Sequence, residues 1–311
     1  MTKTATFEMK GVYKSKTIFV KFVTTFLKTT PILQNMGYNT ILLRPGEIFL
    51  KGKNRNLFEN KLVSNIKKIA FIDQVKKLRG RFIVDYFDNH NLLKNVFGLT
   101  SYSLAIKIDR DVEEIKKEAL KLLQSECKSQ KTFRVETKRS DKSFPIKSPE
   151  LSISVGKFIE ENSNFEFKFK NQDITLHIEI NQSGVYLFIE KIDCFGGLPT
   201  GVEGKVFLLV ENKFSILAGL MFMKRGCFVV PVAYSEKDIS LLQKFYPQEI
   251  KLKIVKDFSA FQKFSEDYHL DALVVGDNFE TKKEYQTDLL IFRPLIAFSG
   301  EEIEEKLEEF S

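Results

Sequence analysis

The five residues 211–215 stand where an α/β nucleotide-binding domain carries its phosphate-binding loop. They are Glu211, Asn212, Lys213, Phe214 and Ser215. An apolar run over 206–210 precedes them and predicts a buried strand, and a helical pattern follows over 213–225. A phosphate-binding turn normally contains glycines, because backbone N–H groups must approach the anion closely. The glycines are missing here and Glu211 would repel a phosphate, so we expect no ATP cofactor, and no pattern predicts a metal.

Three cations, Lys51, Lys53 and Arg55, surround Gly52 just before a predicted helix over 56–72. Cationic side chains and the free N–H groups of a helix N-terminus both favour a phosphate group. The segment therefore predicts a contact with a nucleic-acid backbone. The alternative is a solvated loop that caps the helix.

A second cationic segment follows a predicted strand and contains Lys138, Arg139, Lys142 and Phe144. The cations suit a phosphate backbone, and Phe144 lies on a loop where it could stack on an unpaired base. The alternative for Phe144 is a place in the hydrophobic core, where loop phenylalanines usually lie. Lys138 and Arg139 are therefore the stronger candidates for RNA binding.

The net charge of +7 is unevenly distributed along the 311 residues. Residues 1–110 contain 20 Lys and Arg against 7 Asp and Glu, whereas residues 204–311 contain 14 against 18. A basic front half and an acidic back half indicate that a polyanion would bind the N-terminal side. A compositional bias towards lysine is the alternative explanation.

Composition also limits the class of protein. Apolar residues make up 43% of the chain and 30 residues are Phe, so the chain can bury several cores. Cys127, Cys194 and Cys227 form no CxxC pair, which predicts a reducing, cytoplasmic setting and argues against a zinc ribbon or a disulfide framework. No apolar run approaches the roughly 20 residues of a membrane span.

The elements that would position these residues form three α/β groups. The first follows the order βαββαβ, which is ferredoxin-like, and the last alternates strands and helices, which predicts a parallel sheet. The expected fold class is therefore α/β with an α+β N-terminal part. The expected divisions are an extension (1–35), a ferredoxin-like domain (36–110), a second α/β domain (111–195), a hinge (196–203) and a shortened Rossmann-like domain (204–311).

Three motifs resemble those of the tRNA 4-thiouridine synthetases, also called tRNA sulfurtransferases. They are GEIFLKGKNR before the first long helix, FRVETKRSDKSFP at the second cationic segment, and GGLPTGVEGKV followed by a helix that ends in MKRG. The resemblance implies a ferredoxin-like domain, a THUMP domain over 111–195 and a PP-loop ATP pyrophosphatase domain opened by an SGGxDS loop. It also implies that the THUMP domain binds the acceptor stem and 3′ end of tRNA.

The chain departs from this family at the SGGxDS loop. Aligned through MKRG, Glu211 and Asn212 replace the two glycines and Phe214 replaces the aspartate, and only Ser215 keeps the expected residue. The chain also stops before the region that carries the family's catalytic cysteine. Cys227 begins a predicted buried strand, which favours a structural role, so we expect no catalytic residue.

Three hypotheses follow from these features. The preferred one is a tRNA-binding THUMP protein whose PP-loop domain is inactive or altered. The second is an active tRNA sulfurtransferase with a divergent loop, for which ATP would be a substrate. The third is a structural module whose C-terminal sheet pairs with a second copy or another protein. None of them involves a membrane or DNA.

Residues 1–35 contain six basic residues, one acidic residue and an apolar stretch over 17–27. We expect a poorly ordered extension or a start codon assigned too far upstream. A signal peptide is disfavoured because no small-residue cleavage site follows the apolar stretch.

Overall fold

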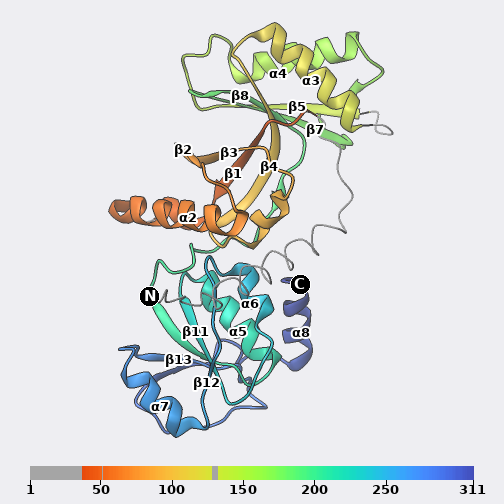
Figure 1. Ribbon diagram of the computed structural model, residues 1–311. Coiled ribbons are helices and arrows are strands. Elements are labelled where there is room, and N and C mark those ends of the chain that lie inside the picture. The colour runs from red at the N-terminus through yellow and green to blue at the C-terminus, as the bar shows by residue number, and fades with distance from the viewer. Residues whose placement is uncertain (1–36, 51, 128–131) are drawn as a thin grey trace, which may run out of the picture. The chain divides into compact units, whose positions relative to one another are not determined.

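The computed structural model describes residues 37–50, 52–127 and 132–311 (Figure 1). The expectation for the extension over 1–35 lies outside the described residues. No helix among the described residues has the length and apolar character that crossing a bilayer requires.

The first half of the described chain forms one mixed sheet of nine strands. Its strands are β1 (Thr40–Pro45), β2 (Lys76–Leu78), β3 (Arg81–Asp85), β4 (Leu99–Ile108), β5 (Thr132–Arg139), β6 (Glu166–Phe167), β7 (Ile174–Asn181), β8 (Gly184–Phe188) and β9 (Ile192–Asp193). Their order is β2-β3-β1-β4-β8-β7-β5-β6, and β9 also pairs with β4. The ferredoxin-like part contributes β1 to β4, and the next α/β unit contributes β5 to β8.

Strand β4 belongs to both of these units. Its residues from Leu99 to Ala105 pair with β1, and its residues from Ile106 to Ile108 pair with β8. Two units that the sequence suggests are separate domains are therefore continuous through one backbone ladder.

The helices of this half pack on the side chains of alternate residues of the sheet. They are η1 (Glu47–Leu50), η2 (Gly52–Asn54), α2 (Arg55–Ala70), η3 (His90–Asn95), α3 (Val112–Glu126) and α4 (Ser148–Glu161). Tyr102 of β4 packs in the core under α2, and Ile106 and Ile108 pack in the core under α3 and α4. These positions alternate along the strand, so both cores lie on the same face of β4. The helix expected near residue 92 is a short 3₁₀ helix instead of an α-helix.

The last part of the chain forms a second sheet in which all strands are parallel. Its strands are β10 (Lys205–Leu209), β11 (Phe228–Ala233), β12 (Lys253–Ile254), β13 (Ala272–Val274) and β14 (Leu290–Phe292), in the order β12-β11-β10-β13-β14. Strand β14 is not among the expected strands, because the apolar run over 289–292 is too short to distinguish a strand from a loop.

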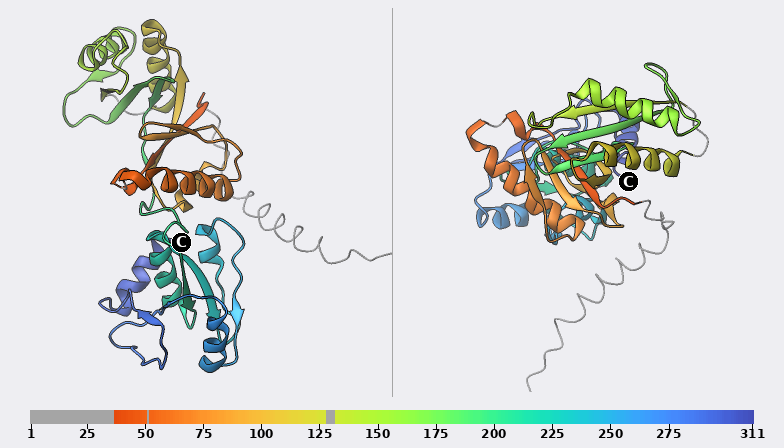
Figure 2. Two further views of the ribbon diagram at one scale, coloured as in Figure 1. Left: turned by 90° about the vertical axis from the view of Figure 1, so that its left-hand side faces the viewer. Right: turned by 90° about the horizontal axis from the view of Figure 1, so that it is seen from above.

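Helices cover both faces of this parallel sheet (Figure 2). They are α5 (Lys213–Lys224), α6 (Ser240–Phe245), α7 (Phe258–Glu266) and α8 (Gly300–Glu308). Successive residues of β10 point to opposite faces, so Leu208 packs in the core with α5, α6 and α8, and Phe207 packs in the core with α7. The architecture is the doubly wound parallel sheet that the alternating pattern predicts.

The segment over 196–203 joins the two sheets and depends on glycine. Gly197 has a φ of +79°, and a Cβ atom there would lie 2.3 Å from the carbonyl oxygen of Lys224. The neighbouring Leu198 N–H donates to that same carbonyl at 2.9 Å. Only glycine permits both the backbone angle and this close approach. The segment therefore packs tightly on the end of α5.

Candidate nucleic-acid interface and nucleotide-fold crevice

The parallel sheet has a topological switch point between β10 and β13. The chain runs outward from β10 to β11 and β12 and then returns to the other side of β10 as β13. Ligands of doubly wound sheets bind in the crevice outside the carboxyl ends of the strands at this point. We call the corresponding region here the switch-point crevice, and define it by Glu211, Ser215, Gly276 and Asp277.

Helix α5 begins at the switch-point crevice, and its first N–H groups already have acceptors. The Asn212 Oδ1 atom accepts hydrogen bonds from the backbone N–H groups of Phe214 at 2.9 Å and Ser215 at 3.3 Å. The Ser215 hydroxyl accepts from the backbone N–H of Glu211 at 3.2 Å, and Ser215 is 1% exposed. A side chain therefore caps the helix end that would hold a phosphate.

Glu211 is neutralised within the protein. The Lys283 Nζ atom lies 3.0 Å from both carboxylate oxygens of Glu211. The Tyr285 hydroxyl lies 3.4 Å from Glu211 Oε2 and 3.3 Å from Oδ1 of the buried Asp277. Burial and these two carboxylates raise the pKa of Tyr285, so its hydroxyl stays protonated and can donate to either carboxylate.

The connection from β13 to β14 supplies both partners of Glu211, and neither is among the site residues expected from sequence. The adjacent cations Lys282 and Lys283, in an otherwise polar segment, are the only sequence feature that points to this connection. Lys213, which stands in the loop itself, points elsewhere: its Nζ lies 2.6 Å from Glu304 of α8. The charge that balances Glu211 thus comes from a residue 72 positions away.

Close packing further limits the space in the switch-point crevice. A Cβ atom on Gly276 would lie 2.4 Å from the backbone nitrogen of Ser215 and 2.7 Å from its Cα atom. The end of β13 therefore lies directly against the first turn of α5. Side chains and backbone of the protein therefore fill the space that a phosphate-binding loop would leave for the anion.

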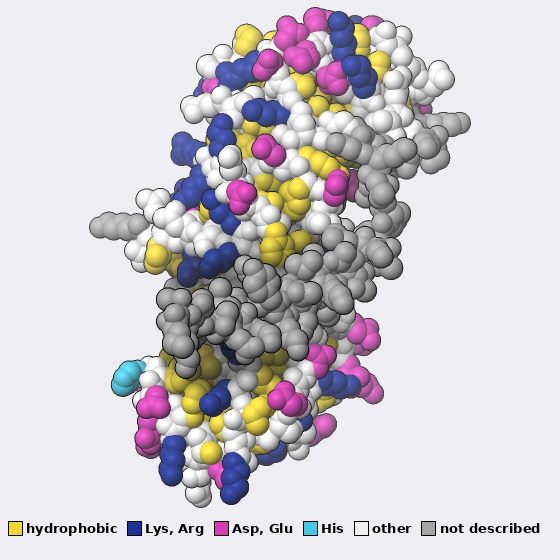
Figure 3. All heavy atoms as spheres, viewed as in Figure 1, with side chains coloured by type: hydrophobic (Ala, Val, Ile, Leu, Met, Phe, Trp, Pro, Cys, Tyr) yellow, Lys and Arg dark blue, Asp and Glu magenta, His cyan; other side chains and the backbone are white. Residues whose placement is uncertain are grey.

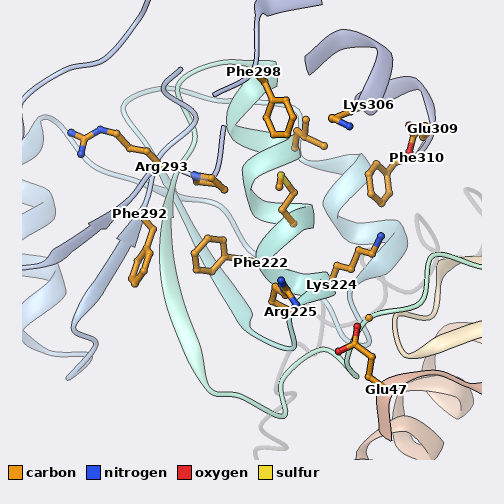
Figure 4. A pocket seen from close by; sticks show the side chains of 14 residues that line it. Glu47, Phe222, Lys224, Arg225, Phe292, Arg293, Phe298, Lys306, Glu309 and Phe310 are labelled. Carbon is orange, nitrogen blue, oxygen red and sulfur yellow. The ribbon is translucent and has the colours of Figure 1, made fainter. Parts of the chain in front are cut away.

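A pocket of about 600 Å³ lies at the other end of α5 and does not include the residues of the switch-point crevice. Figure 4 shows Phe222, Phe292, Phe298 and Phe310 around it, with Lys224, Arg225 and Lys306 also among its lining residues. Its acidic lining residues are Glu47 and Glu309. Because doubly wound sheets bind their ligands at the switch point, we place the chemistry of a nucleotide fold at the switch-point crevice.

The cysteines have the properties of structural thiols. Burial raises the pKa of Cys194 to about 12 and that of Cys127 to about 11, and it also raises the pKa of Cys227. Raised values disfavour the thiolate, which is the reactive form. These positions support the structural role expected for Cys227.

The first group of predicted RNA contacts lies at the start of α2. Lys51 lies outside the described residues, and of Lys53 the structure describes only its position in η2. Arg55 is the first residue of α2, and its Nε atom lies 2.6 Å from Glu59 one turn later. This ion pair lowers the net positive charge that Arg55 can offer to a phosphate.

The second group lies at the end of β5 and in the loop after it. Lys138 and Lys142 are exposed. Arg139 instead holds the loop, because its Nη1 atom donates to the carbonyl oxygens of Phe144 at 2.7 Å and Ile146 at 3.0 Å. Phe144 is 2% exposed and packs in the core under α3 and α4. The stacking role for Phe144 is therefore corrected: its ring faces the core and offers no face to a base.

Other exposed cations lie near these positions. Lys76, Lys77 and Arg79 are exposed on the β2–β3 hairpin, where they follow the α2 helix in the chain. Figure 3 shows lysine and arginine side chains along one side of the upper, N-terminal half. Exposed cations are therefore present on both the ferredoxin-like and the THUMP-type parts, although residues 111–203 contain 14 Lys and Arg against 16 Asp and Glu.

Comparisons with known proteins agree with this architecture. A family model described as the ThiI ferredoxin-like domain matches residues 40–103, and one described as the THUMP domain matches residues 109–190. The fold thus defines a protein that joins a ThiI-type ferredoxin-like domain, a THUMP domain and a parallel nucleotide-type sheet.

Relatives identify the family. The chain is 33% identical over 263 residues to a probable tRNA sulfurtransferase of Mycoplasmopsis synoviae, covering 82% of this chain and 67% of that protein. It is 38% identical over 201 residues to a probable tRNA sulfurtransferase of Brevibacillus brevis, covering 61% of this chain and 50% of that protein. The chain belongs to the tRNA sulfurtransferase family, and it spans about half to two thirds of the length of these relatives.

Two solved structures share the fold. The crystal structure of PH1313 from Pyrococcus horikoshii matches with a TM-score of 0.77 and 30% identity, over 87% of this chain and 99% of that one. A crystal structure of a 4-thiouridine synthetase–RNA complex with bound ATP matches with a TM-score of 0.75 and 26% identity, over 88% of this chain and 85% of that one.

Proposed function

We propose that this chain binds tRNA at its acceptor stem and 3′ end through the ferredoxin-like and THUMP domains, and that it does not activate tRNA with ATP. The THUMP match, the exposed cations Lys138 and Lys142 and the RNA-bound state of a solved relative support the first part. The chain would act as an RNA-presenting subunit or regulator, in the cytoplasm.

One observation carries the second part, namely that the helix end at the switch-point crevice is already capped. Asn212 accepts from the two N–H groups that a phosphate would need, and the carboxylates of Glu211 and Asp277 both contact the Tyr285 hydroxyl. A triphosphate would have to displace the cap and separate Lys283 from Glu211. The obstacle to a phosphate is therefore the capped helix end and the close packing of the crevice, because Lys283 already compensates the charge of Glu211.

Paired titrations test this proposal. We expect tRNA to bind with an affinity that falls steeply as salt increases, and to bind more weakly when its 3′ end is removed. Lys138→Ala and Lys142→Ala should weaken binding, whereas Lys256→Ala, an exposed lysine of the C-terminal domain, should not. ATP titrated with and without tRNA should give no saturable binding and no pyrophosphate.

The competing function is an active ATP-dependent tRNA sulfurtransferase with a divergent loop. The parallel sheet, its switch point and the Ser215 hydroxyl at the start of α5 favour it. Adenylylation of tRNA by the purified chain would establish this function and overturn the second part of our proposal. Loss of salt-sensitive tRNA binding would overturn the first part.

A protein partner is a further part of the proposal. Strand β14 exposes Leu290 and Phe292 to 63% and 42%, and it lies at the end of the strand order. An exposed apolar edge strand can pair with a second copy or with another chain. A chain that remains monomeric at high concentration and copurifies with no partner would exclude this association.

A further inference from the structure

A charged pair connects two strands that are far apart in the order of the first sheet. Arg81 of β3 contacts Glu179 of β7 through two hydrogen bonds, at 3.1 Å from Nε to Oε2 and 3.2 Å from Nη2 to Oε1. Strands β1, β4 and β8 lie between β3 and β7 in the strand order. Four strand spacings amount to about 19 Å in a flat sheet, which is more than these two side chains can span.

The sheet must therefore bend sharply along the strand that both domains share. A small core lies inside the bend, and its residues come from both half-sheets: Leu42, Ile83, Ala105, Tyr186 and Phe188. They are between 0% and 7% exposed although they lie on the face opposite the helices. Two half-sheets that pack across a bent strand bury such a core between them. The Arg81–Glu179 pair joins the half-sheets beside it.

A second arginine completes this contact. Arg44 of β1 is 8% exposed, its Nη1 atom donates to the Ser103 hydroxyl at 3.0 Å, and its Nη2 atom lies 3.6 Å from Glu179 Oε1. Its guanidinium also lies 5.0 Å from the centre of the Phe188 ring. Glu179 is thus the one acidic member of a charged triad with two arginines. Removing its charge would leave the buried Arg44 and the partly exposed Arg81 without their counter-ion.

The triad lies next to the proposed RNA contacts. Glu179 is paired in register with Lys138, which is exposed on the neighbouring strand β5. Arg81 follows the exposed Arg79 of the β2–β3 hairpin by two residues. Through its contact with Arg81, Glu179 therefore connects β7, which lies beside the strand that carries Lys138, to the β2–β3 hairpin, which carries Arg79.

We propose that Glu179 is a positioning residue that holds the ferredoxin-like and THUMP half-sheets at one fixed angle, so that a folded RNA stem contacts the cations of both domains at the same time. This inference rests on the proposed tRNA binding. Glu179 does not contact RNA itself, since it is 9% exposed and its oxygens already contact Arg81 and Arg44. Its effect on affinity comes from keeping two weak contact surfaces in one rigid arrangement.

The test compares two RNA probes on the same variants. An acceptor-stem minihelix is long enough to reach both domains, whereas a single-stranded tetranucleotide reaches only one. Glu179→Gln keeps the shape of the side chain and removes its charge. We expect Glu179→Gln to bind the minihelix at least about tenfold more weakly and the tetranucleotide with unchanged affinity, because only the minihelix depends on simultaneous contacts. Glu118→Gln, which removes an exposed pairing with Lys121 on α3, is the matched control and should change neither affinity.

A conservative variant separates positioning from a general loss of structure. Glu179→Asp keeps a carboxylate on the side that faces both arginines, so it should retain more of the minihelix affinity than Glu179→Gln does. Equal weakening of both probes by Glu179→Gln, or an equal loss of minihelix affinity in Glu179→Asp and Glu179→Gln, would overturn the inference. Unchanged minihelix binding by Glu179→Gln would overturn it while leaving the proposed function intact. A parent chain that binds neither probe would overturn both.

Discussion

The Lys283 ammonium group lies 3.0 Å from each carboxylate oxygen of Glu211, and this pair brings the β13–β14 connection to the end of β10. Its geometry explains how a carboxylate is tolerated where the tRNA sulfurtransferase family is expected to carry glycine. The cation compensates the carboxylate without any bound ligand. The loop over 211–215 lacks the expected glycines, and its carboxylate is nevertheless paired within the protein.

The Glu211–Lys283 pair should contribute a modest, salt-sensitive amount to stability. Glu211 is 25% exposed and Lys283 is 55% exposed at the side chain, so solvent weakens their attraction. We expect a double-mutant cycle with Glu211→Gln and Lys283→Met to give a coupling free energy of about 0.5–1 kcal/mol. Urea denaturation at low and high salt measures it. A coupling that is zero at low salt would contradict the contact.

Asn212 should act as the N-cap of α5. Asn212→Ala removes the acceptor of two backbone N–H groups and should lower the free energy of unfolding by about 1 kcal/mol. Asn212→Asp keeps an acceptor at the same place and serves as the matched control. Chemical denaturation of the three proteins decides the point. Equal stability of the Ala and Asp variants would show that the cap contributes nothing.

Gly276 should tolerate no side chain. Gly276→Ala places a methyl group within 2.4 Å of the Ser215 backbone nitrogen, so β13 and α5 must separate. Such overpacking typically costs about 1–3 kcal/mol. Gly300→Ala is the control, because a Cβ atom there would have an ordinary contact of 3.7 Å with Phe214. Thermal unfolding of both variants tests the prediction, and similar midpoints for the two would refute it.

His177 should make stability depend on pH in the acidic range. Burial, followed by the nearby Lys191, lowers the pKa of His177 from 6.5 to about 4, so the folded state resists a proton that the unfolded chain accepts. The contribution is fully present above pH 6.5 and is lost as the pH falls through 4. We expect His177→Gln to show a smaller loss of stability between pH 7 and pH 4.5 than the parent chain.

The exposed His269 provides the comparison for this experiment. His269→Gln introduces the same residue at an exposed position and controls for the substitution itself. Urea denaturation at the two pH values is the measurement. A parent chain whose loss of stability equals that of His177→Gln would show that folding does not lower the pKa of His177.

The native thiols should react slowly with alkylating reagents at pH 8. Burial raises the pKa values of Cys127 and Cys194 well above their usual value of 9.0, so little thiolate forms in the folded protein. Mass spectrometry after brief exposure to iodoacetamide should find all three cysteines largely unmodified, and denatured protein should be modified at all three. One rapidly labelled cysteine in the folded chain would contradict the structural role.

The raised thiol pKa values also determine the direction in which stability changes at alkaline pH. The unfolded chain loses its thiol protons first, so the folded state holds more protons as the pH rises above about 9. The stabilising contribution is present below that pH and is lost above it. Replacement of Cys194 by Ser should therefore reduce the loss of stability between pH 8 and pH 10.

The spacing of apolar residues predicts most of the fold, because a long periodic segment is compatible with only one kind of secondary structure. The strands before and after α5 and the βαββαβ order belong to this group. Two features were hidden for physical reasons. Strand β14 has only three residues and is recognised by its pairing with β13, which no local pattern reveals. The bend of the first sheet depends on contacts between residues that are distant in the chain, such as Arg81 and Glu179.

The candidate sites were harder to predict than the fold. The loop over 211–215 was located from sequence, but its partners Lys283 and Tyr285 depend on the path of a connection without regular structure. Arg139 and Phe144 have residue types that suit RNA, yet the fold uses one to hold a loop and the other to fill a core. Residue type alone does not separate such uses, because burial is decided by tertiary packing.

Strand β4, which pairs with β1 along most of its length and with β8 at its end, has a practical consequence for anyone who wishes to study the RNA-binding modules one at a time. A protein fragment that ends at residue 110 leaves the end of β4 without its partner strand β8. A fragment that starts at residue 111 leaves β8 without its partner strand β4. Each fragment would expose an unsatisfied strand edge and would tend to precipitate on expression. The smallest portion worth cloning therefore contains both modules together.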